Sequence, residues 1–251
     1  MKPVPIIIPY YKAPDELEKC RQHLRASTYQ NLDEFIHDNS EHNIYFTAAI
    51  NEGLKQHAFR PDVDYVLVLN QNAYVFPDAI SNLVSFMDAH PDVAIGAPLN
   101  LTLDGTRVTW GGSGEVWPSG VHVTLPLGQY VNPVETPRAS GSCMLIRTEA
   151  IKEVGMLDKT LRFICSDSDF SLSVRARGWK IFVVPSAKIF HEFGASTKTA
   201  SREINSVKAE DMVRFAEKWM NGDLFKRIAY RGDAMGRIQI KHEIENFRRM
   251  I

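Results

Sequence analysis

The sequence predicts an α/β fold in which helices flank a mostly parallel sheet. Two observations support this fold class. Short apolar runs alternate with helical patterns over the first hundred residues, and polar clusters follow directly after the apolar runs. Strands separated by helices of roughly ten to fifteen residues form right-handed β-α-β units and hence parallel sheets. The 251 residues are enough for one large domain with a sizeable core.

The first half of the chain gives the clearest pattern. The first strand is predicted at 4–8, where an apolar, β-branched run is closed by Pro9. Pro14 and the two acids after it suit the first turn of a helix, because that turn has unpaired amides and a positive dipole end. The other elements predicted here are a strand at 34–37, a helix capped by Asn43, a strand at 63–69, a helix at 77–87 and a strand at 93–95.

The second half is less regular. Segment 102–137 is rich in Gly, Pro, Thr and Val, which predicts short strands and loops without a clear helix. The elements predicted after it are a strand at 143–147, a short helix at Glu149, a helix at 169–177 with Gly178 as C-cap, strands at 180–184 and 188–190, and a helix at about 200–220.

Composition excludes several classes of protein. The formal net charge of -1 gives no global attraction to nucleic acid or to an anionic membrane. The three cysteines lie far apart without a CxxC pair, which argues against a disulfide scaffold or a zinc site and predicts a reducing, cytoplasmic location. The longest apolar run is too short for a membrane span or a signal sequence. Neither GxGxxG nor a P-loop is present, so these phosphate cradles are unsupported.

Polar and aromatic clusters follow three predicted strands. Tyr10 and Tyr11 follow the first, Asp38 ends the second, and Asn70 and Asn72 follow the third. Ligands of open parallel sheets bind outside the carboxyl ends of the strands. A tyrosine there could lie against a base, and Asp38 could accept from a base or a sugar hydroxyl. Asp38 also suits a simple turn, but three clusters at one edge together favour a nucleotide site.

A second candidate region begins at Ser166. The residues Ser-Asp-Ser-Asp precede an apolar helix, and Ser166 or Asp169 could simply cap it. A further carboxylate beside a cap can face a cleft and take a proton from an attacking hydroxyl. His191 follows a predicted strand, and a lone histidine is more often a packed or surface residue than a ligand.

Taken together and in order, these motifs resemble the family 2 glycosyltransferases of the GT-A fold, and most of all the bacterial rhamnosyltransferase-like branch that builds polysaccharide. The resemblance covers most of residues 4–195. The segments that carry it are IIIPYYK, EFIHDNS, NIYFTAAINEGLK, DYVLVLNQNAYVFPDAI, SDSDFSLSVRARGW and KIFHEFGAS.

The resemblance implies a donor site and a metal site. Nucleotide-sugar-binding roles fall on Pro9, Tyr10, Tyr11, Asp38, Asn51, Asn70 and Lys198. Asn72 and His191 would hold a divalent cation, Mn²⁺ or Mg²⁺, at the diphosphate. Asn72 stands where the family carries the last Asp of its Asp-x-Asp motif, and an amide lacks the charge of a carboxylate. Weak metal binding is therefore expected.

The acceptor side follows from the same resemblance. Asp167 would be the general base of an inverting displacement, and the residues expected to border the acceptor are Trp110, Gly141, Ser142 and Asp169. Trp110 could equally belong to the core. The implied organisation is one transferase domain at 1–200, with donor binding in 1–100 and acceptor binding in 101–200, and a helical extension of that domain at 201–251.

The expected reaction moves a sugar from a UDP- or dTDP-linked donor to a hydroxyl of a glycan or glycolipid. One alternative is a catalytically silent module that binds a nucleotide sugar or glycan, because Asn-Gln-Asn is uncharged. Another is a transferase acting on hydroxymethylated bases in DNA, which the basic residues of 226–249 would serve, although interleaved acids make a solvated helix face the better interpretation. A homodimer through the C-terminal helix is a further expectation.

Overall fold

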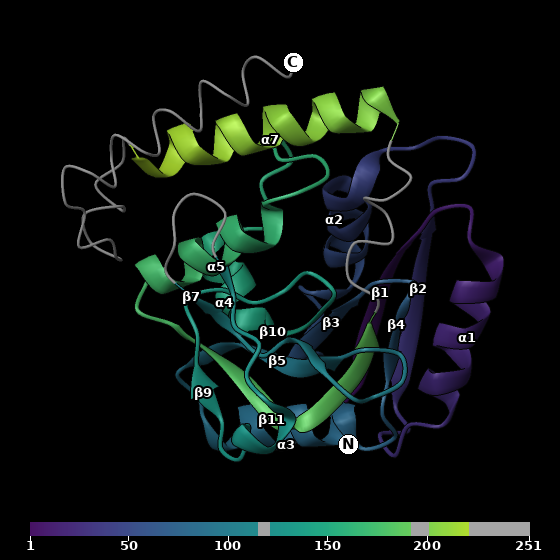
Figure 1. The fold of residues 1–251 in the computed structure, drawn as a ribbon, viewed down its shortest axis with the longest axis vertical. Helices are drawn as coiled ribbons and strands as arrows, with labels where there is room; N and C mark the ends of the chain where they lie inside the picture. The colour runs from purple at the N-terminus through teal and green to yellow at the C-terminus, as the bar shows by residue number, and fades with distance from the viewer. Residues whose placement is uncertain (115–120, 192–200, 221–251) are drawn as a thin grey trace.

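The computed structural model describes residues 1–114, 121–191 and 201–220. A nine-stranded sheet forms its centre, with helices on both faces and one long helix across the end of the molecule (Figure 1). The main path of the sheet runs β2-β1-β3-β10-β5-β11-β4, while β6 pairs with β5 and β9 with β11. A separate two-stranded sheet joins β7 to β8.

The strand bounds follow the apolar runs of the sequence. The strands are β1 Val4–Tyr10, β2 Leu32–Asp38, β3 Tyr65–Leu69, β4 Ala73–Val75, β5 Val93–Leu101, β6 Val108–Trp110, β7 Ser113–Gly114, β8 Val121–His122, β9 Val134–Glu135, β10 Cys143–Arg147 and β11 Lys180–His191. The helices are α1 Pro14–Arg25, α2 Tyr45–His57, α3 Ala79–Ala89, the 3₁₀ turn η1 Leu127–Gln129, α4 Thr148–Val154, α5 Ser166–Ala176 and α7 Arg202–Met220.

Five strands of the sheet run in one direction. β1 pairs in parallel with β2 and β3, and β5 pairs in parallel with β11. β10 is antiparallel to both β3 and β5, so those two also point the same way. β4 is antiparallel to β11. Consequently the carboxyl ends of β1, β2, β3, β5 and β11 and the start of β10 and β4 share one edge of the sheet.

The predicted α/β class is confirmed, with differences of detail. The strands predicted at 180–184 and 188–190 form a single β11, whose pairing with β5 shifts register between Val184 and Lys188. The helix predicted to begin at residue 169 begins at Ser166, because the polar residues taken for a cap form its first turn. Within the described part of 102–137, η1 is the only helical turn, as expected.

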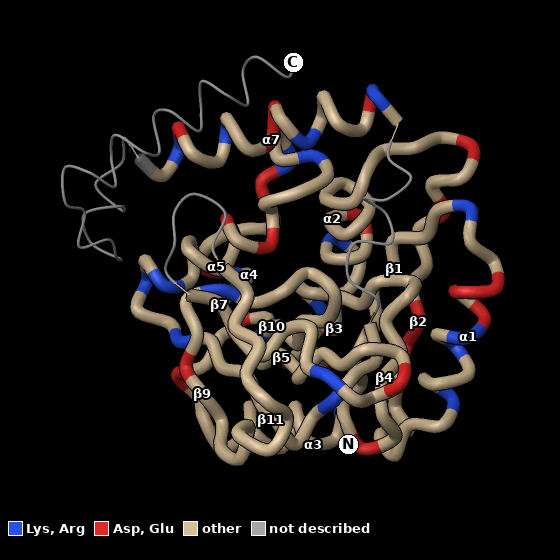
Figure 2. The backbone as a smooth tube through the Cα atoms, in the orientation of Figure 1, with Lys and Arg blue, Asp and Glu red and all other residues tan. Residues whose placement is uncertain are grey.

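The core has two layers, one on each face of the sheet. Ile7 belongs to one layer, while Ile6 and Ile8 belong to the other, and all three are fully buried. A strand buried on both faces needs a continuous apolar run instead of an alternating one. Charged residues are found mainly on the surrounding helices and loops, and the central strands are almost free of them (Figure 2).

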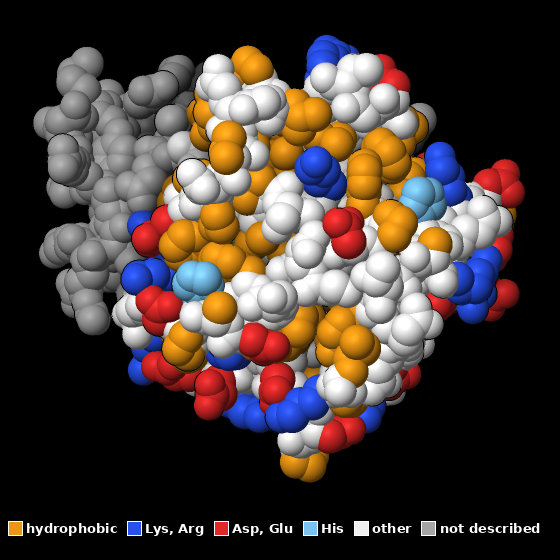
Figure 3. Space-filling model, turned by 90° about the horizontal axis from the view of Figure 1, so that it is seen from below, with side chains coloured by type: hydrophobic (Ala, Val, Ile, Leu, Met, Phe, Trp, Pro, Cys, Tyr) orange, Lys and Arg blue, Asp and Glu red, His pale blue; other side chains and the backbone are white. Residues whose placement is uncertain are grey.

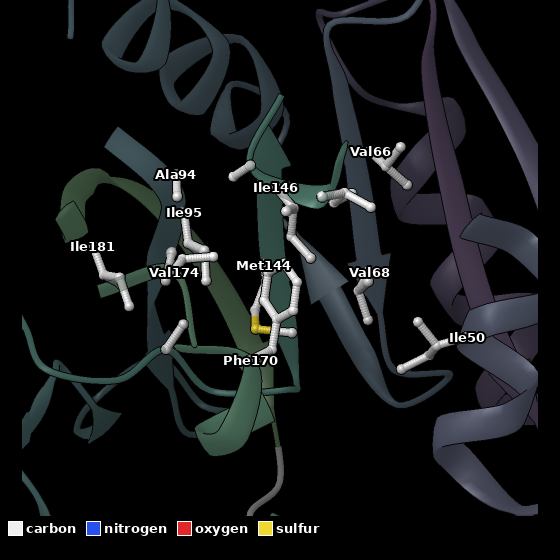
Figure 4. Close-up of a cluster of buried hydrophobic side chains, with 14 of the residues drawn as sticks. Ile50, Val66, Val68, Ala94, Ile95, Met144, Ile146, Phe170, Val174 and Ile181 are labelled. Atoms are coloured by element: carbon white, nitrogen blue, oxygen red, sulfur yellow. The ribbon is translucent and has the colours of Figure 1, made fainter. Parts of the chain in front are cut away.

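Helix α5 is held on the sheet by its apolar side. Phe170 packs beside Met144 of β10, and Val174 lies in the same cluster (Figure 4). This packing carries the first turn of α5 to the sheet edge at which β10 begins. Among the described residues, no helix has both the length and the apolar character needed to cross a membrane.

Close packing of α2 on β1 gives a test of the fold. A Cβ at Gly53 would lie 2.7 Å from the Ile7 side chain. We expect Gly53→Ala to destabilise the protein by about 1 kcal/mol in urea unfolding, because overpacking at about 1–3 kcal/mol outweighs the roughly 1 kcal/mol helix-propensity gain. Gly128→Ala is the matched control, since no atom lies within 4 Å of a Cβ there. Equal stability of the two variants would contradict this packing.

Candidate functional site

The polar clusters that follow β1, β2 and β3 meet at one edge of the sheet, as the sequence predicts. Tyr10 and Asp38 are register partners at the ends of β1 and β2. The Tyr11 amide donates to Gln71 Oε1 at 2.7 Å, which ties the end of β1 to the residues that follow β3. Pro9 and Tyr10 are half-buried, while Tyr11 is 47% exposed. Aromatic and carboxylate groups are therefore side by side on an accessible edge.

Asp38 is exposed and ionised in its loop. Its Oδ1 accepts the Ser40 amide at 2.8 Å, and hydrogen bonds from the side chain and amide of Ser40 lower the pKa of Asp38. The next residue, Asn39, is buried and its Oδ1 accepts the Ile44 amide at 3.0 Å, which fixes the entry to α2. The Asp38 carboxylate is therefore exposed to solvent, while the hydrogen bond of Asn39 holds the backbone beside it in place.

Asn70 lies in a buried polar cluster at the middle of this edge. Its amide donates to the Ser142 carbonyl at 2.9 Å. Asn100 Nδ2 donates to Ser142 Oγ at 2.7 Å, and Ser142 Oγ lies 2.9 Å from Ser140 Oγ. The Oδ1 atoms of Asn70 and Asn100 are buried without a hydrogen-bond partner among the described protein atoms. Two acceptors in this state suit donors from a ligand or from water.

Asn72 lies in the turn before β4, and His191 ends β11, the strand that pairs with β4. His191 is the register partner of Ala73, the residue after Asn72, and it is 8% exposed. Within the part of the chain that is described, no group of three or more His, Cys, Asp and Glu side chains could hold a metal ion. One imidazole and one amide oxygen fit a divalent cation only when a bound diphosphate supplies further oxygens.

Asp167 occupies the first turn of α5. Its Oδ2 accepts the Gly141 amide at 2.8 Å and its Oδ1 accepts the Ser168 amide at 2.7 Å. A Cβ at position 141 would lie 3.0 Å from Asp167 Oδ2, so glycine permits this close approach of backbone and carboxylate. Directly before the helix, Cys165 has a φ of 67°, a left-handed conformation that is uncommon for a residue with a side chain.

The segment 140–142 joins the two candidate regions. Gly141 donates to Asp167, and the adjacent Ser142 accepts from Asn70. Residues nearly one hundred positions apart in the sequence therefore share one continuous hydrogen-bonded edge. Asp38, Asn70, Ser142, Gly141 and Asp167 are brought together, whereas three other predicted residues have different surroundings.

Trp110 is buried instead of lining an open surface. It is 2% exposed in β6, belongs to the core, and its Nε1 donates to Ser113 Oγ at 3.3 Å. The interpretation of Trp110 as an acceptor-stacking ring is therefore wrong for this conformation. The core alternative holds because Trp110 is the register partner of Asn100 in the buried strand β5.

Asp169 faces α7 instead of an acceptor. Its carboxylate accepts Lys218 Nζ at 2.8 Å and Trp219 Nε1 at 2.8 Å, and the residue is 2% exposed. Burial raises the pKa of Asp169. The structure corrects the prediction that Asp169 borders the acceptor, because both carboxylate oxygens already have protein partners.

Asn51 has a similar internal role. Its Nδ2 donates to the Leu157 carbonyl at 2.8 Å and its Oδ1 accepts the Leu157 amide at 3.1 Å. Both ends of the amide hold the loop after α4 against α2, which gives Asn51 a structural role. Lys198, predicted at the donor site, lies outside the described residues, as do the basic residues of 226–249.

Two residues of this edge, Asn100 and Ser140, were not predicted, nor was His122, which lies near Asp167 in the separate two-stranded sheet. An asparagine within the apolar run of β5 was the available signal for Asn100. His122 lies in β8 as the partner of Ser113. Desolvation lowers the pKa of the His122 imidazole, while the nearby Asp167 charge and a hydrogen bond with the Thr109 backbone act in the opposite direction.

The charge of Asp167 should be visible at His122. We expect NMR titration to place the pKa of His122 below the ordinary histidine value, and Asp167→Asn to lower it further, because the carboxylate that favours the imidazolium is removed. Asp92→Asn, which changes a carboxylate paired with Lys180 at the start of β11, is the control and should leave the titration unchanged. A His122 pKa that is unchanged or raised in Asp167→Asn would show that the Asp167 charge does not act on His122.

The sequence is similar to named transferases. Two of them are the N-acetylglucosaminyl-diphospho-decaprenol L-rhamnosyltransferases of two Mycobacterium tuberculosis strains, each 28% identical over 177 residues, which cover 62% of this chain and 58% of theirs. The human polypeptide N-acetylgalactosaminyltransferase 3 is 26% identical over 128 residues, covering 45% of this chain and 20% of that protein. The chain thus spans less than two thirds of the length of these relatives.

Solved structures share the fold. A crystal structure of GalNAc-T7 with UDP, GalNAc and Mn²⁺ matches 100% of this chain and 56% of its own, with a TM-score of 0.64 and 13% identity. The structure of S. aureus TarS matches 98% of this chain and 43% of its own, with a TM-score of 0.58 and 15% identity. These neighbours confirm the GT-A fold.

The family follows from a longer match. Residues 65–242 match the sequence profile of the glycosyl transferase family group 2. This range contains Asn70, the 140–142 segment, Asp167 and His191, and it covers well over half of the chain. The protein therefore belongs to glycosyl transferase family group 2.

Proposed function

We propose that this chain transfers a sugar from a nucleoside diphosphate donor to a hydroxyl group, with Asp167 as the general base. One observation carries the proposal: segment 140–142 connects Asp167 to Asn70 through two hydrogen bonds, from the Gly141 amide to the Asp167 carboxylate and from the Asn70 amide to the Ser142 carbonyl. A base beside the polar sheet edge can act on an acceptor that approaches a donor bound at that edge. Family membership supports the same reaction class.

The donor would lie across the ends of β1, β2 and β3. Asp38 is an exposed acceptor for a nucleoside N–H or ribose hydroxyl, and Tyr10 and Tyr11 offer rings beside it. The Oδ1 atoms of Asn70 and Asn100 are acceptors for sugar hydroxyls. We assign donor binding to residues 1–100 and acceptor binding to 101–200, with 201–251 as an extension of the same domain.

Asn72 and His191 would hold a divalent cation together with the donor diphosphate. When bound, the ion stabilises the negative charge that develops on the leaving group. The chain itself supplies an imidazole and an amide instead of a carboxylate pair, so ion binding should depend on the nucleotide. The GalNAc-T7 structure, which contains Mn²⁺ and UDP, supports a divalent cation in a protein of this fold.

Asp167 would accept the proton of the acceptor hydroxyl as that oxygen attacks the anomeric carbon. The new glycosidic bond forms while the bond to the diphosphate breaks, and the configuration inverts because attack and departure occur on opposite faces. Two backbone amides hold the Asp167 oxygens and leave each with a further lone pair for the proton. The carboxylate is thereby positioned before the acceptor arrives.

The names of the relatives suggest the substrates. The Mycobacterium tuberculosis relatives are named as L-rhamnosyltransferases acting on a lipid-linked diphosphate sugar. We propose a UDP- or dTDP-linked hexose or deoxyhexose as donor and a glycan or glycolipid as acceptor, as in polysaccharide biosynthesis in the cytoplasm. No observation on the described residues favours DNA as substrate, and acidic and basic side chains are interspersed on the face shown in Figure 3.

A donor screen tests the proposal. UDP-, dTDP- and GDP-sugars would each be incubated with the protein, Mn²⁺ and mixed glycan and polyprenyl-diphosphate acceptors, and released nucleoside diphosphate would be measured. Release with one donor, dependent on an acceptor, supports a transferase. Nucleotide binding without release from any donor would instead favour the silent binding module.

A further inference from the structure

Helix α7 binds the loop that leads into the proposed base. Asp211 of α7 is fully buried. Its carboxylate accepts the amides of Arg162, Phe163 and Ile164 at 3.0, 2.6 and 3.0 Å. These three residues are consecutive, and only Cys165 separates them from Ser166, the first residue of α5.

Three successive amides that converge on one carboxylate form an anion-binding concavity of the backbone. Hydrogen bonds to an ionised acceptor are shorter and stronger than those between neutral groups. Here the anion belongs to the protein itself, so the backbone of 162–164 is fixed by a residue nearly fifty positions away. The left-handed turn at Cys165 then starts α5 from this fixed loop.

A second contact lies on the other side of Asp167. Asp169 accepts from Lys218 and Trp219, which are in the last turn of α7. Trp219 and Phe215 also pack on Leu161 and Leu172 in a separate apolar cluster. Figure 1 shows α7 lying along this side of the molecule next to α5. Helix α7 therefore binds the chain both before Asp167, at residues 162–164, and after it, at Asp169.

We propose that α7 sets the position of Asp167 and that Asp211 is a positioning residue for sugar transfer, an inference that rests on the proposed function. Asp211 is buried among backbone amides and touches no surface that an acceptor could reach. Its effect on the reaction must then pass through loop 162–164 to the first turn of α5. The distance from Asp167 to the Gly141 amide depends on that turn.

Asp211→Asn tests the inference with little change of volume. The amide keeps one acceptor but turns an NH₂ group towards backbone donors. We expect kcat to fall at least tenfold, while donor KM and nucleotide Kd stay within twofold, because the Asp211 carboxylate holds loop 162–164 and the donor residues lie on β1 and β2. Glu210→Gln is the control, since Glu210 is the adjacent residue, contacts the half-buried side chain of Arg162 and the exposed side chain of Arg214 instead of backbone amides, and as Gln keeps an oxygen that accepts from both.

Hydrogen exchange gives a readout that does not depend on activity. Amides of 162–168 should exchange faster in Asp211→Asn than in the wild type and Glu210→Gln. Should Asp211→Asn fail to fold, Trp219→Phe removes the hydrogen bond to Asp169 together with part of the ring packing on Leu161 and Leu172, and it should show a smaller fall in kcat with the same unchanged donor KM.

The inference is overturned if folded Asp211→Asn keeps kcat within twofold, or if Glu210→Gln loses as much. Absence of transfer by the wild type would instead count against the proposed function. In that case exchange of 162–168 decides the claim about α7, and rates equal to the wild type in Asp211→Asn would refute it.

Discussion

Replacing Asp167 by Asn is expected to slow sugar transfer at least a hundredfold and to leave nucleotide binding intact. An amide cannot take the acceptor proton, and loss of a general base costs about 10²–10⁴-fold in kcat. The Asn oxygen can still accept the Gly141 amide, so the first turn of α5 should keep its place. Initial rates of nucleotide release and a calorimetric titration of the same preparation would separate the two effects.

Asp92→Asn is the matched control for this result. Asp92 precedes β5 and pairs with Lys180 at the amino end of β11, the opposite edge of the sheet. It should retain full kcat. An Asp167→Asn enzyme with more than a tenth of the wild-type kcat would assign the base to another residue.

Asp169→Ala is expected to give the largest loss of stability among the acidic residues of α5. The Trp219 indole N–H, at a residue 1% exposed, would lose its acceptor, and Lys218 would keep only Asp158. A buried indole N–H without an acceptor costs about 1–3 kcal/mol, and the Lys218 pair adds less than about 1 kcal/mol because the Lys218 side chain is 41% exposed and keeps Asp158. Urea unfolding measures this change.

Asp92→Ala removes an exposed ion pair and should cost less than about 1 kcal/mol. The folded fraction of Asp169→Ala should keep the acceptor KM of the wild type, because Asp169 faces α7. A stable Asp169→Ala protein with a raised acceptor KM would restore the acceptor-binding role that the sequence suggested.

The order of elements could be predicted because the local pattern determines it. Apolar runs such as that of β3 are buried on both faces, and Pro14 marks the start of α1. The direction of β10 could not be predicted, because a five-residue apolar strand has the same sequence pattern in a parallel and in an antiparallel pair. Its position between β3 and β5 depends on contacts across the sheet.

The site residues also divide into those that the local sequence pattern predicts and those that depend on contacts between distant parts of the chain. Asp38 and Asn70 end or follow strands, and a parallel sheet brings such residues together at one edge. Asp169 was assigned to the acceptor because nothing local distinguishes a carboxylate that faces a cleft from one that meets Lys218 and Trp219 fifty residues later. His122 was missed because the segment around it has no regular pattern.

The uncharged Asn-Gln-Asn sequence after β3 sets this chain apart from the Asp-x-Asp pattern of the family. Asn70 is built into the Ser142 cluster by its backbone, so the change does not remove its structural contact. The loss of charge bears on the cation instead, and it makes the response to Mn²⁺ the most informative property of the donor site.

Calorimetric titration with UDP, dTDP and GDP, each with and without Mn²⁺, tests the central claim that the shared sheet edge is a nucleotide-sugar site. We expect one nucleotide to bind, Mn²⁺ to strengthen its binding, and His191→Ala to remove the strengthening but not the binding. Absence of binding by all three nucleotides, with and without Mn²⁺, would contradict it.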